Sequence, residues 1–96
     1  MENKELEFVT YYERQLEIAK RFKSIRKKEK ISQKQLADMS GVSYGSIRRF
    51  ENTGDISLAS LLKLSIAIQR FDDWKLLFEN KKEYKSIEDV INDQED

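Results

Sequence analysis

The stretch that decides the fold is Ser32–Glu51, which reads SQKQLADMSGVSYGSIRRFE. Ser32 can cap a helix that begins at the next residue, because its hydroxyl accepts a backbone N–H that has no partner within the helix. Gly41 then supplies the left-handed backbone conformation that ends this helix and turns the chain sharply. Ser43 caps a second helix, in which apolar residues at helical spacing face inward. The stretch therefore predicts two short helices joined by a tight turn.

The second of these helices presents polar and cationic residues on its outward face, and a helix–turn–helix of this layout suits the major groove of DNA. Ser43 and Tyr44 open the helix, at the end that reaches base edges first. Arg48 lies one turn beyond Tyr44 and can contact a guanine bidentately or bind a phosphate. Gly45 has no side chain and would let the backbone approach the groove floor. The alternatives are that Tyr44 packs on the surface and that Arg48 pairs with a nearby acidic residue.

Four further polar residues are predicted to contact the phosphate backbone on either side of this helix. At the start of the first motif helix, a side-chain amide and the free backbone N–H groups can bind one phosphate together. Arg49 lies one position round the helix from Arg48 and is predicted to bind another phosphate. Asn52 and Thr53 follow at the end of the helix and can donate to the phosphates on the opposite side of the groove. The predicted phosphate contacts are Gln33, Arg49, Asn52 and Thr53.

The composition describes one small, mostly helical domain with few of the usual catalytic groups. A chain of 96 residues can form a single modest core, and the absence of proline with only three glycines favours helices. Without cysteine or histidine there is no disulfide and no conventional zinc site, and the commonest general base is missing. We therefore predict that the protein is not an enzyme and has no catalytic residue, metal site or cofactor. No signal-peptide pattern or membrane-spanning run is evident, so the expected location is the cytoplasm, without a membrane partner.

The net charge is zero, but the charges are segregated along the chain. Residues 20–49 carry ten lysines and arginines against two acidic residues, a balance of +8. The balance is −3 over residues 1–19 and −5 over residues 50–96. Because only cations near the docking face displace counterions from DNA, the central excess favours phosphate binding. The acidic ends would then point away from DNA or toward another protein.

Hydrophobic spacing predicts five helices in an all-α chain. The first covers roughly Glu13–Glu29, and it either begins near Glu5 or follows a separate short helix. The second and third are the two motif helices, and Ser57 caps the fourth. A short fifth helix opens at Asp72 or Asp73, where acidic residues favour a helix start.

We therefore predict that the chain divides into three segments. Residues 1–15 form an N-terminal helical extension, residues 16–80 form the DNA-binding domain, and residues 81–96 form an acidic C-terminal tail. Within the tail, Ser86 could start a final amphipathic turn.

One recognition helix reads only a few base pairs, so useful specificity generally requires two half-sites and a dimer. We therefore expect a homodimer on a palindromic operator in double-stranded DNA. Trp74, Leu77 and Phe78 follow the fourth helix, where a second copy could cover them or where they could close the monomer's own core. The next candidates for a dimer or partner contact are Tyr12, Tyr11 and Phe8.

Residues Ile18–Phe78, about two thirds of the chain, resemble the Cro/C1 (XRE) family of lambda-repressor-like, five-helix DNA-binding domains. The matching signature is IAKRFKSIRKKEKISQKQLADMSGVSYGSIRRFENTGDISLASLLKLSIAI. The resemblance implies that Gln33 contacts phosphate and that the first residues of the second motif helix read bases. It also implies that Arg26 pairs internally with Glu51, which would make Arg26 structural rather than a phosphate ligand.

A narrower resemblance concerns SYGSIRRFENTGDISLASLLKLSIAI followed by DDWKLLFE, which is similar to HipB-type antitoxins. It implies a dimeric repressor that binds a HipA-like Ser/Thr kinase toxin and represses its own operon. Phage-type repressors and stand-alone transcriptional regulators share much of this signature and remain alternatives. A third alternative is a helix–turn–helix reused as a protein-interaction module, which the zero net charge and the acidic ends would suit.

Overall fold

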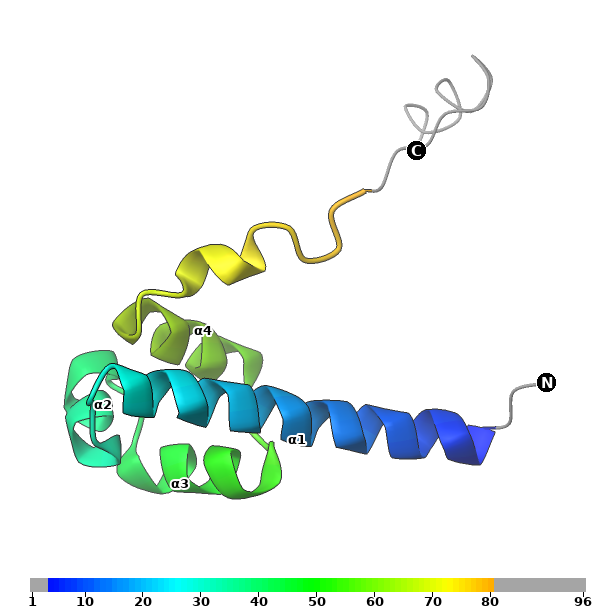
Figure 1. Cartoon of the computed structure of the whole chain (residues 1–96), viewed down its shortest axis with the longest axis horizontal. Helices are drawn as coiled ribbons and strands as arrows, with labels where there is room; N and C mark the ends of the chain where they lie inside the picture. Colours follow the sequence, from blue (N-terminus) through cyan, green and yellow to red (C-terminus); the bar gives the residue numbers. More distant parts are fainter. Residues whose placement is uncertain (1–3, 81–96) are drawn as a thin grey trace, which may run out of the picture.

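The computed structural model describes the chain over residues 4–80, with side chains described from residue 10 onward. The elements are the α-helices α1 (Lys4–Lys28), α2 (Gln33–Ser40), α3 (Tyr44–Thr53) and α4 (Leu58–Ala67), and the short 3-10 helix η1 (Phe71–Trp74). Figure 1 shows α1 as a long rod, with the other three α-helices gathered around its C-terminal half. The prediction of an all-α chain built on a helix–turn–helix is confirmed for these residues.

The predicted caps form local hydrogen bonds that start and stop the motif helices. The Ser32 hydroxyl accepts the backbone N–H of Gln35 at 3.0 Å, and the Gln35 side chain accepts the N–H of Ser32 at 2.8 Å. Gly41 ends α2 in the left-handed region at φ 78°. The hydroxyls of Ser43 and Ser57 then cap α3 and α4 in the same way. The turn between α2 and α3 is therefore encoded by residues that are only a few positions apart.

The core lies where α2, α3 and α4 meet the C-terminal half of α1. Phe22 of α1 packs edge-to-face against Phe50 of α3, with ring centroids 5.4 Å apart. Each large apolar side chain that is removed from water contributes about 1.5–3 kcal/mol to the free energy of unfolding. The buried hydrophobic residues are Ala19, Phe22, Leu36, Val42, Ile47, Phe50, Leu64 and Ile68.

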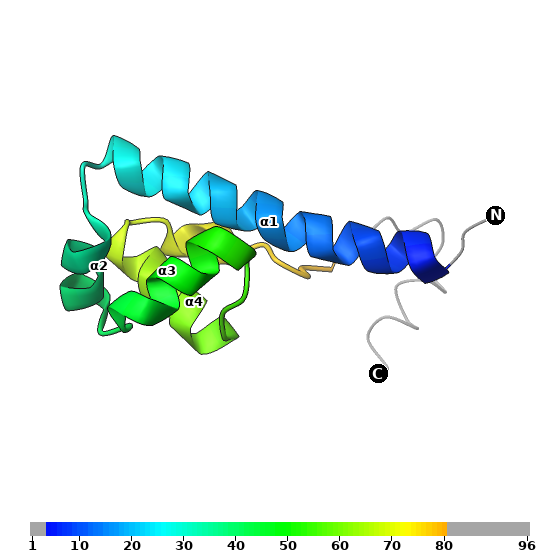
Figure 2. The ribbon, with the colours of Figure 1, turned by 90° about the horizontal axis from the view of Figure 1, so that it is seen from below.

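The first helix starts earlier than Glu13 and runs unbroken from Lys4 through residue 15, where the N-terminal extension was predicted to end. Figure 2 shows its N-terminal part extending past the end of α3. At Gln15, α1 contacts the turn after α3, because the Gln15 Nε2 donates to the Gly54 carbonyl oxygen at 3.3 Å. A Cβ on Gly54 would lie 2.9 Å from the Gln15 backbone, so this glycine sets how closely α1 approaches the turn after α3.

The short fifth helix predicted at Asp72 or Asp73 is present in the described residues only as the single 3-10 turn η1, so a fifth α-helix is not confirmed. No side chain caps η1, and residues with positive φ stand on either side of it, Gln69 at 60° and Phe78 at 61°. Leu77 and Phe78 therefore lie in turns after η1. The predicted acidic tail over residues 81–96 and its turn at Ser86 lie outside the described residues.

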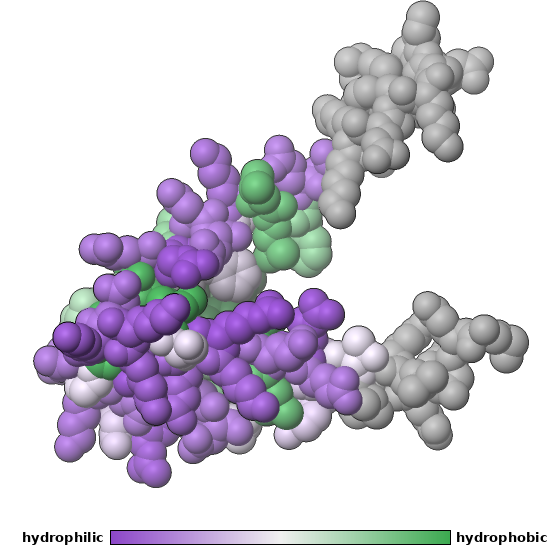
Figure 3. Space-filling view, viewed as in Figure 1, coloured by the Kyte–Doolittle hydropathy of each residue, from purple (hydrophilic) through white to green (hydrophobic). Residues whose placement is uncertain are grey.

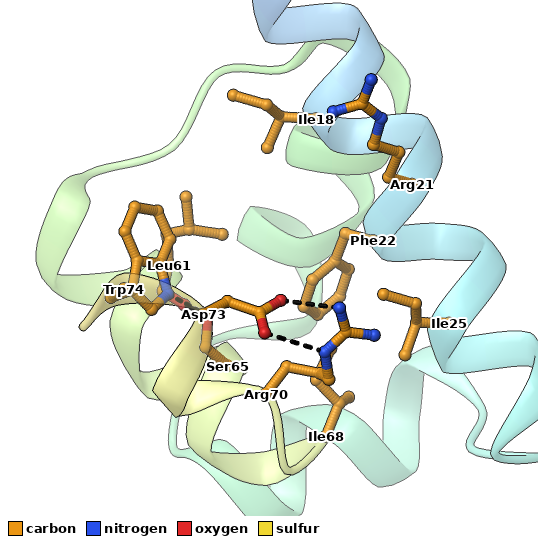
Figure 4. A pocket seen from close by; sticks show the side chains of 10 residues that line it. All are labelled: Ile18, Arg21, Phe22, Ile25, Leu61, Ser65, Ile68, Arg70, Asp73 and Trp74. Carbon is orange, nitrogen blue, oxygen red and sulfur yellow. Dashed lines mark hydrogen bonds and ion pairs between the residues drawn. The ribbon is translucent and has the colours of Figure 1, made fainter. Parts of the chain in front are cut away.

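A side-chain hydrogen bond holds η1 against α4, and an ion pair forms within the turn itself. The Trp74 indole Nε1 donates to the Ser65 hydroxyl at 2.9 Å, and Arg70 pairs with Asp73 at 2.8 Å. Figure 4 shows these residues on one side of a pocket of about 280 Å³, with Phe22 and Ile25 of α1 on the other side. Trp74 thus closes part of the monomer's own interior rather than projecting from it.

Candidate nucleic-acid interface

The recognition helix α3 has one buried face and one exposed face. Ile47 and Phe50 are almost fully buried and fasten α3 to the core, as predicted. Figure 3 shows hydrophilic side chains over most of the visible face of the domain and hydrophobic ones gathered beside the chain that follows η1. The exposed residues of α3 and its cap are Ser43, Tyr44, Gly45, Ser46, Arg48, Arg49, Asn52 and Thr53.

Two of the three predicted base readers lie together on this exposed face. The Arg48 guanidinium carbon is 5.6 Å from the centroid of the Tyr44 ring. Ser43 is committed to the start of the helix, because its hydroxyl accepts the Ser46 N–H at 3.1 Å and donates to the Ser46 hydroxyl at 2.8 Å. Tyr44 and Arg48 are therefore the side chains with the most freedom to reach a base edge.

A third side chain, which the sequence did not single out, joins Tyr44 and Arg48. The Lys34 Nζ lies 5.7 Å from the centroid of the Tyr44 ring, although Lys34 belongs to α2. We name Lys34, Tyr44 and Arg48 the exposed cation cluster. The sequence did place Lys34 directly after the predicted phosphate contact Gln33. The proximity of Lys34 to Tyr44, however, depends on how α2 crosses α3.

Gln33 is half-buried and belongs to a hydrogen-bonded network around a buried ion pair. Arg26 binds Glu51 bidentately, with Nε to Oε2 at 2.7 Å and Nη2 to Oε1 at 2.8 Å. Arg26 also donates to the Ile31 carbonyl oxygen at 2.8 Å, and the Gln33 Nε2 donates to Glu51 Oε1 at 2.9 Å. The network joins α1, α2 and α3, and it leaves Gln33 one further amide N–H for a ligand.

The ion pair between Arg26 and Glu51 is removed from solvent. The side chain of Arg26 is 8% exposed and that of Glu51 is 0% exposed. Within residues 10–80, every buried side-chain nitrogen and oxygen has a hydrogen-bond partner. Glu51 is therefore unavailable to DNA, and its role in the described structure is to hold three helices together.

The predicted phosphate contacts at the end of α3 take part in local interactions. The Arg49 guanidinium pairs with the Asp55 carboxylate at 2.7 Å, and both side chains are exposed. The Thr53 hydroxyl donates to the Arg49 carbonyl oxygen at 2.7 Å and accepts the Asp55 N–H at 3.2 Å. Asn52 is exposed beside them. A phosphate that approaches Arg49 must therefore compete with Asp55.

Gly45 has no packing reason to be a glycine. A Cβ built at this position meets no atom within 4 Å, and the residue lies within α3 without a positive φ. Gly45 is the second residue of α3, and glycine at a position whose backbone conformation alanine can adopt lowers stability by about 0.4–1 kcal/mol. The missing side chain lowers the outer surface of α3 next to Tyr44.

The four residues predicted to contact a partner do not form one continuous surface. Leu77 and Phe78 are exposed after η1, with Phe78 at 94% exposed, whereas Trp74 is held by Ser65. Tyr12 lies elsewhere, on α1, in an open hollow of about 390 Å³ that also includes Arg49. The other residues of this hollow are Tyr11, Gln15, Thr53 and Asp55. The side chain of Phe8, another candidate, lies outside the described residues.

The residues that the structure describes contain no group of three or more side chains suited to a metal ion. Their helices also include none with both the length and the apolar character that a membrane span requires.

A comparison with protein families gives one match that coincides with this architecture. The family model described as helix-turn-helix matches residues 22–70, just over half of the chain. The match begins in the C-terminal half of α1 and includes all of α2, α3 and α4. Comparisons with curated proteins and with solved structures returned no match.

Proposed function

The chain belongs to the Cro/C1-type helix–turn–helix family of DNA-binding regulators, and from this we propose that it is a sequence-specific transcriptional repressor. The observation that carries the proposal is the division of α3 into two faces. Ile47 and Phe50 hold one face in the core, while Tyr44, Gly45 and Arg48 are exposed on the other. A helix fixed to its domain on one side and bearing polar groups on the other is what major-groove recognition requires.

In the proposed complex, Tyr44 and Arg48 read bases, and Ser43 joins them by turning its hydroxyl proton from Ser46 to a base. Gly45 allows the backbone of α3 to approach the groove floor. The backbone of the duplex is bound by Gln33, Arg49, Asn52 and Thr53. Arg49 must release Asp55 or share it when a phosphate arrives, because an exposed ion pair is easily exchanged for another.

The repressor is proposed to act as a homodimer on a palindromic operator. The ten residues of α3 can reach only a few base pairs, and two half-sites about 34–36 Å apart would supply the missing specificity. Exposed Leu77, Phe78 and Tyr12 support this part of the proposal, since large apolar side chains are common in dimer interfaces. We propose the cytoplasm as its location.

The narrower proposal is that the repressor is the antitoxin of a HipA-like kinase and controls its own operon. It is supported by the resemblance of residues 43–79 to HipB-type antitoxins. It is also supported by the exposed apolar residues after α4, which offer a surface to a protein partner: Phe71, Leu76, Leu77 and Phe78. A phage-type or stand-alone regulator would share the DNA-binding face but have no toxin, and a protein-interaction module would have no preferred DNA.

The repressor proposal is tested by selecting duplexes from a random pool with the full chain and measuring their affinity by fluorescence anisotropy at several salt concentrations. We expect a preferred duplex whose affinity falls steeply with salt. Arg48→Ala should remove about 1–3 kcal/mol of discrimination, which is the typical contribution of a bidentate base contact. Arg14→Ala is the matched control, because Arg14 is an exposed arginine on α1 that pairs with Glu17.

An absence of preference for any duplex over competitor DNA would contradict the repressor and favour the protein-interaction module. The antitoxin proposal is tested separately, by affinity purification of the natively expressed chain. Recovery of a kinase-like protein at stoichiometric yield would support it. Recovery of DNA alone would remove the antitoxin proposal and leave the repressor standing.

A further inference from the structure

We propose that the exposed cation cluster is a phosphate-binding unit, in which Lys34 contacts the DNA backbone and the ring of Tyr44 positions both Lys34 and Arg48. This inference rests on the proposed DNA binding and adds two points to it. Lys34 becomes a DNA contact, and Tyr44, which was proposed above as a base reader, becomes a positioning residue that acts through its ring rather than through its hydroxyl.

The geometry of the cluster brings together cations from two different helices. Tyr44 is the first residue of α3, and Arg48 follows it by one helical turn. Lys34 is the second residue of α2 and reaches the same ring from the other helix of the motif. A cation within about 6 Å of an aromatic centroid is attracted electrostatically to the face of the ring. The ring therefore draws two positive charges toward one place on the surface.

Arg48 lacks the carboxylate partner that most arginines within residues 10–80 have, and Lys34, like the other lysines within residues 10–80, has no such partner either. Arg14, Arg26, Arg49 and Arg70 each form an ion pair with a carboxylate. Within residues 10–80, no carboxylate forms an ion pair with Lys34 or Arg48. Two like charges held near one ring repel each other, and an anion placed beside them would relieve that repulsion.

The position of the cluster in the motif indicates which anion it binds. In a helix–turn–helix, the second helix lies in the major groove and the first helix crosses the phosphate backbone. Lys34 belongs to the first helix and carries a compact charge with three donors, which suits a phosphate oxygen. Arg48 belongs to the second helix and is exposed on its outward face. Tyr44 therefore links a backbone contact on α2 to the reading helix α3.

The first test measures DNA affinity against salt for the full chain with its selected duplex. Each phosphate contact contributes about 0.9 to the slope of log affinity against log salt. Lys34→Ala should reduce the magnitude of this slope by about 1 and weaken selected and unselected duplexes equally. Lys63→Ala, which removes an exposed lysine from α4, is the matched control and should leave the slope unchanged. Equal slopes for the Lys34 and Lys63 variants would overturn the proposal.

The second test separates the ring of Tyr44 from its hydroxyl. Tyr44→Phe keeps the aromatic face, so its affinity and salt slope should stay within about twofold of the parent chain. Tyr44→Leu removes the aromatic face, so its slope should fall toward that of Lys34→Ala. A loss of selectivity in Tyr44→Phe as large as that in Tyr44→Leu would show that the hydroxyl reads a base, and would overturn the positioning role.

The failure of this inference can be told apart from the failure of the proposed function. If the parent chain shows no preferred duplex, the repressor proposal itself fails. If the parent chain binds its duplex, but the Lys34 and Tyr44 variants bind it no differently from the control variant, the repressor proposal stands and the cluster is not a phosphate-binding unit. Thermal unfolding of each variant, followed by circular dichroism, checks that the substitutions leave the fold intact.

Discussion

The buried ion pair of Arg26 and Glu51 and the exposed cation cluster of Lys34, Tyr44 and Arg48 both join helices through charged side chains, but they use charge in opposite ways. The ion pair is closed to solvent and fully neutralised. The cluster is exposed, and no carboxylate within residues 10–80 forms an ion pair with its cations. A buried charge without a partner would cost several kcal/mol, whereas an exposed one is hydrated and free to bind a ligand.

Two adjacent residues show how closely these regions lie along the chain. Gln33 donates to Glu51 and belongs to the buried network, while Lys34 lies beside Tyr44 in the exposed cluster. Successive residues of a helix point about 100° apart, so the start of α2 serves both regions at once. The buried region determines where α2 and α3 stand, and the exposed region is what they would present to DNA in the proposed complex.

The largest effect is expected from breaking the buried ion pair. Arg26→Ala leaves Glu51 buried without its cation, so the free energy of unfolding should fall by about 3–5 kcal/mol. Urea denaturation followed by circular dichroism measures this loss. Arg14→Ala, which breaks an exposed pair with Glu17, should change stability by less than about 0.5 kcal/mol. Similar losses in the two variants would contradict the distinction between buried and exposed charge.

A smaller loss is expected from Gly54→Ala, which tests backbone packing between α1 and α3 independently of charge. Gly54 has φ 81°, and an added Cβ would lie 2.9 Å from the Gln15 backbone. The left-handed conformation costs a side-chain-bearing residue about 1–2 kcal/mol, and displacement of α1 adds to it. A total loss of about 2–3 kcal/mol should appear in the same denaturation experiment.

Gly45→Ala is the matched control on the exposed side of α3. Because an added Cβ meets no neighbour there, stability should rise by about 0.4–1 kcal/mol. Its DNA affinity should nevertheless fall, since the added methyl group would hold the backbone away from the groove floor. A Gly45→Ala variant that is both more stable and equally tight in binding would show that α3 does not approach DNA at this residue.

The smallest effect is expected from Asp55→Asn, which turns one neutralised exposed arginine into a free one. Arg49 and Asp55 are both well exposed, so stability should change by less than about 0.5 kcal/mol. DNA affinity measured by anisotropy should rise about threefold, because Arg49 no longer has to leave a carboxylate to bind phosphate. Asp73→Asn removes the same charge from a pair on η1 and should have a smaller effect. Equal gains in the two variants would mean that only net charge matters.

Much of the fold was predictable because its starting and stopping signals are local. Ser32, Gly41, Ser43 and Ser57 act on backbone groups a few residues away, and the structure places all four in the roles that were predicted for them. The short fifth helix was predicted at the right place, but its 3-10 form was not, because helical spacing around Trp74 and Leu77 is also compatible with a short turn. Its actual form depends on contacts with α4, chiefly the hydrogen bond from Trp74 to Ser65.

The sequence by itself determined the helix–turn–helix and the inward and outward faces of α3, because these depend on spacing and on hydrogen bonds within a few residues. Beyond the pair of Arg26 and Glu51, which the family resemblance implied, only the tertiary structure decided which polar groups meet across the motif. Asp55 lies next to Arg49, Glu51 receives Gln33 as well as Arg26, and Lys34 meets Tyr44 across the motif. These pairings arise from the angles at which helices cross, and such angles follow from the packing of the whole core rather than from any one stretch of residues.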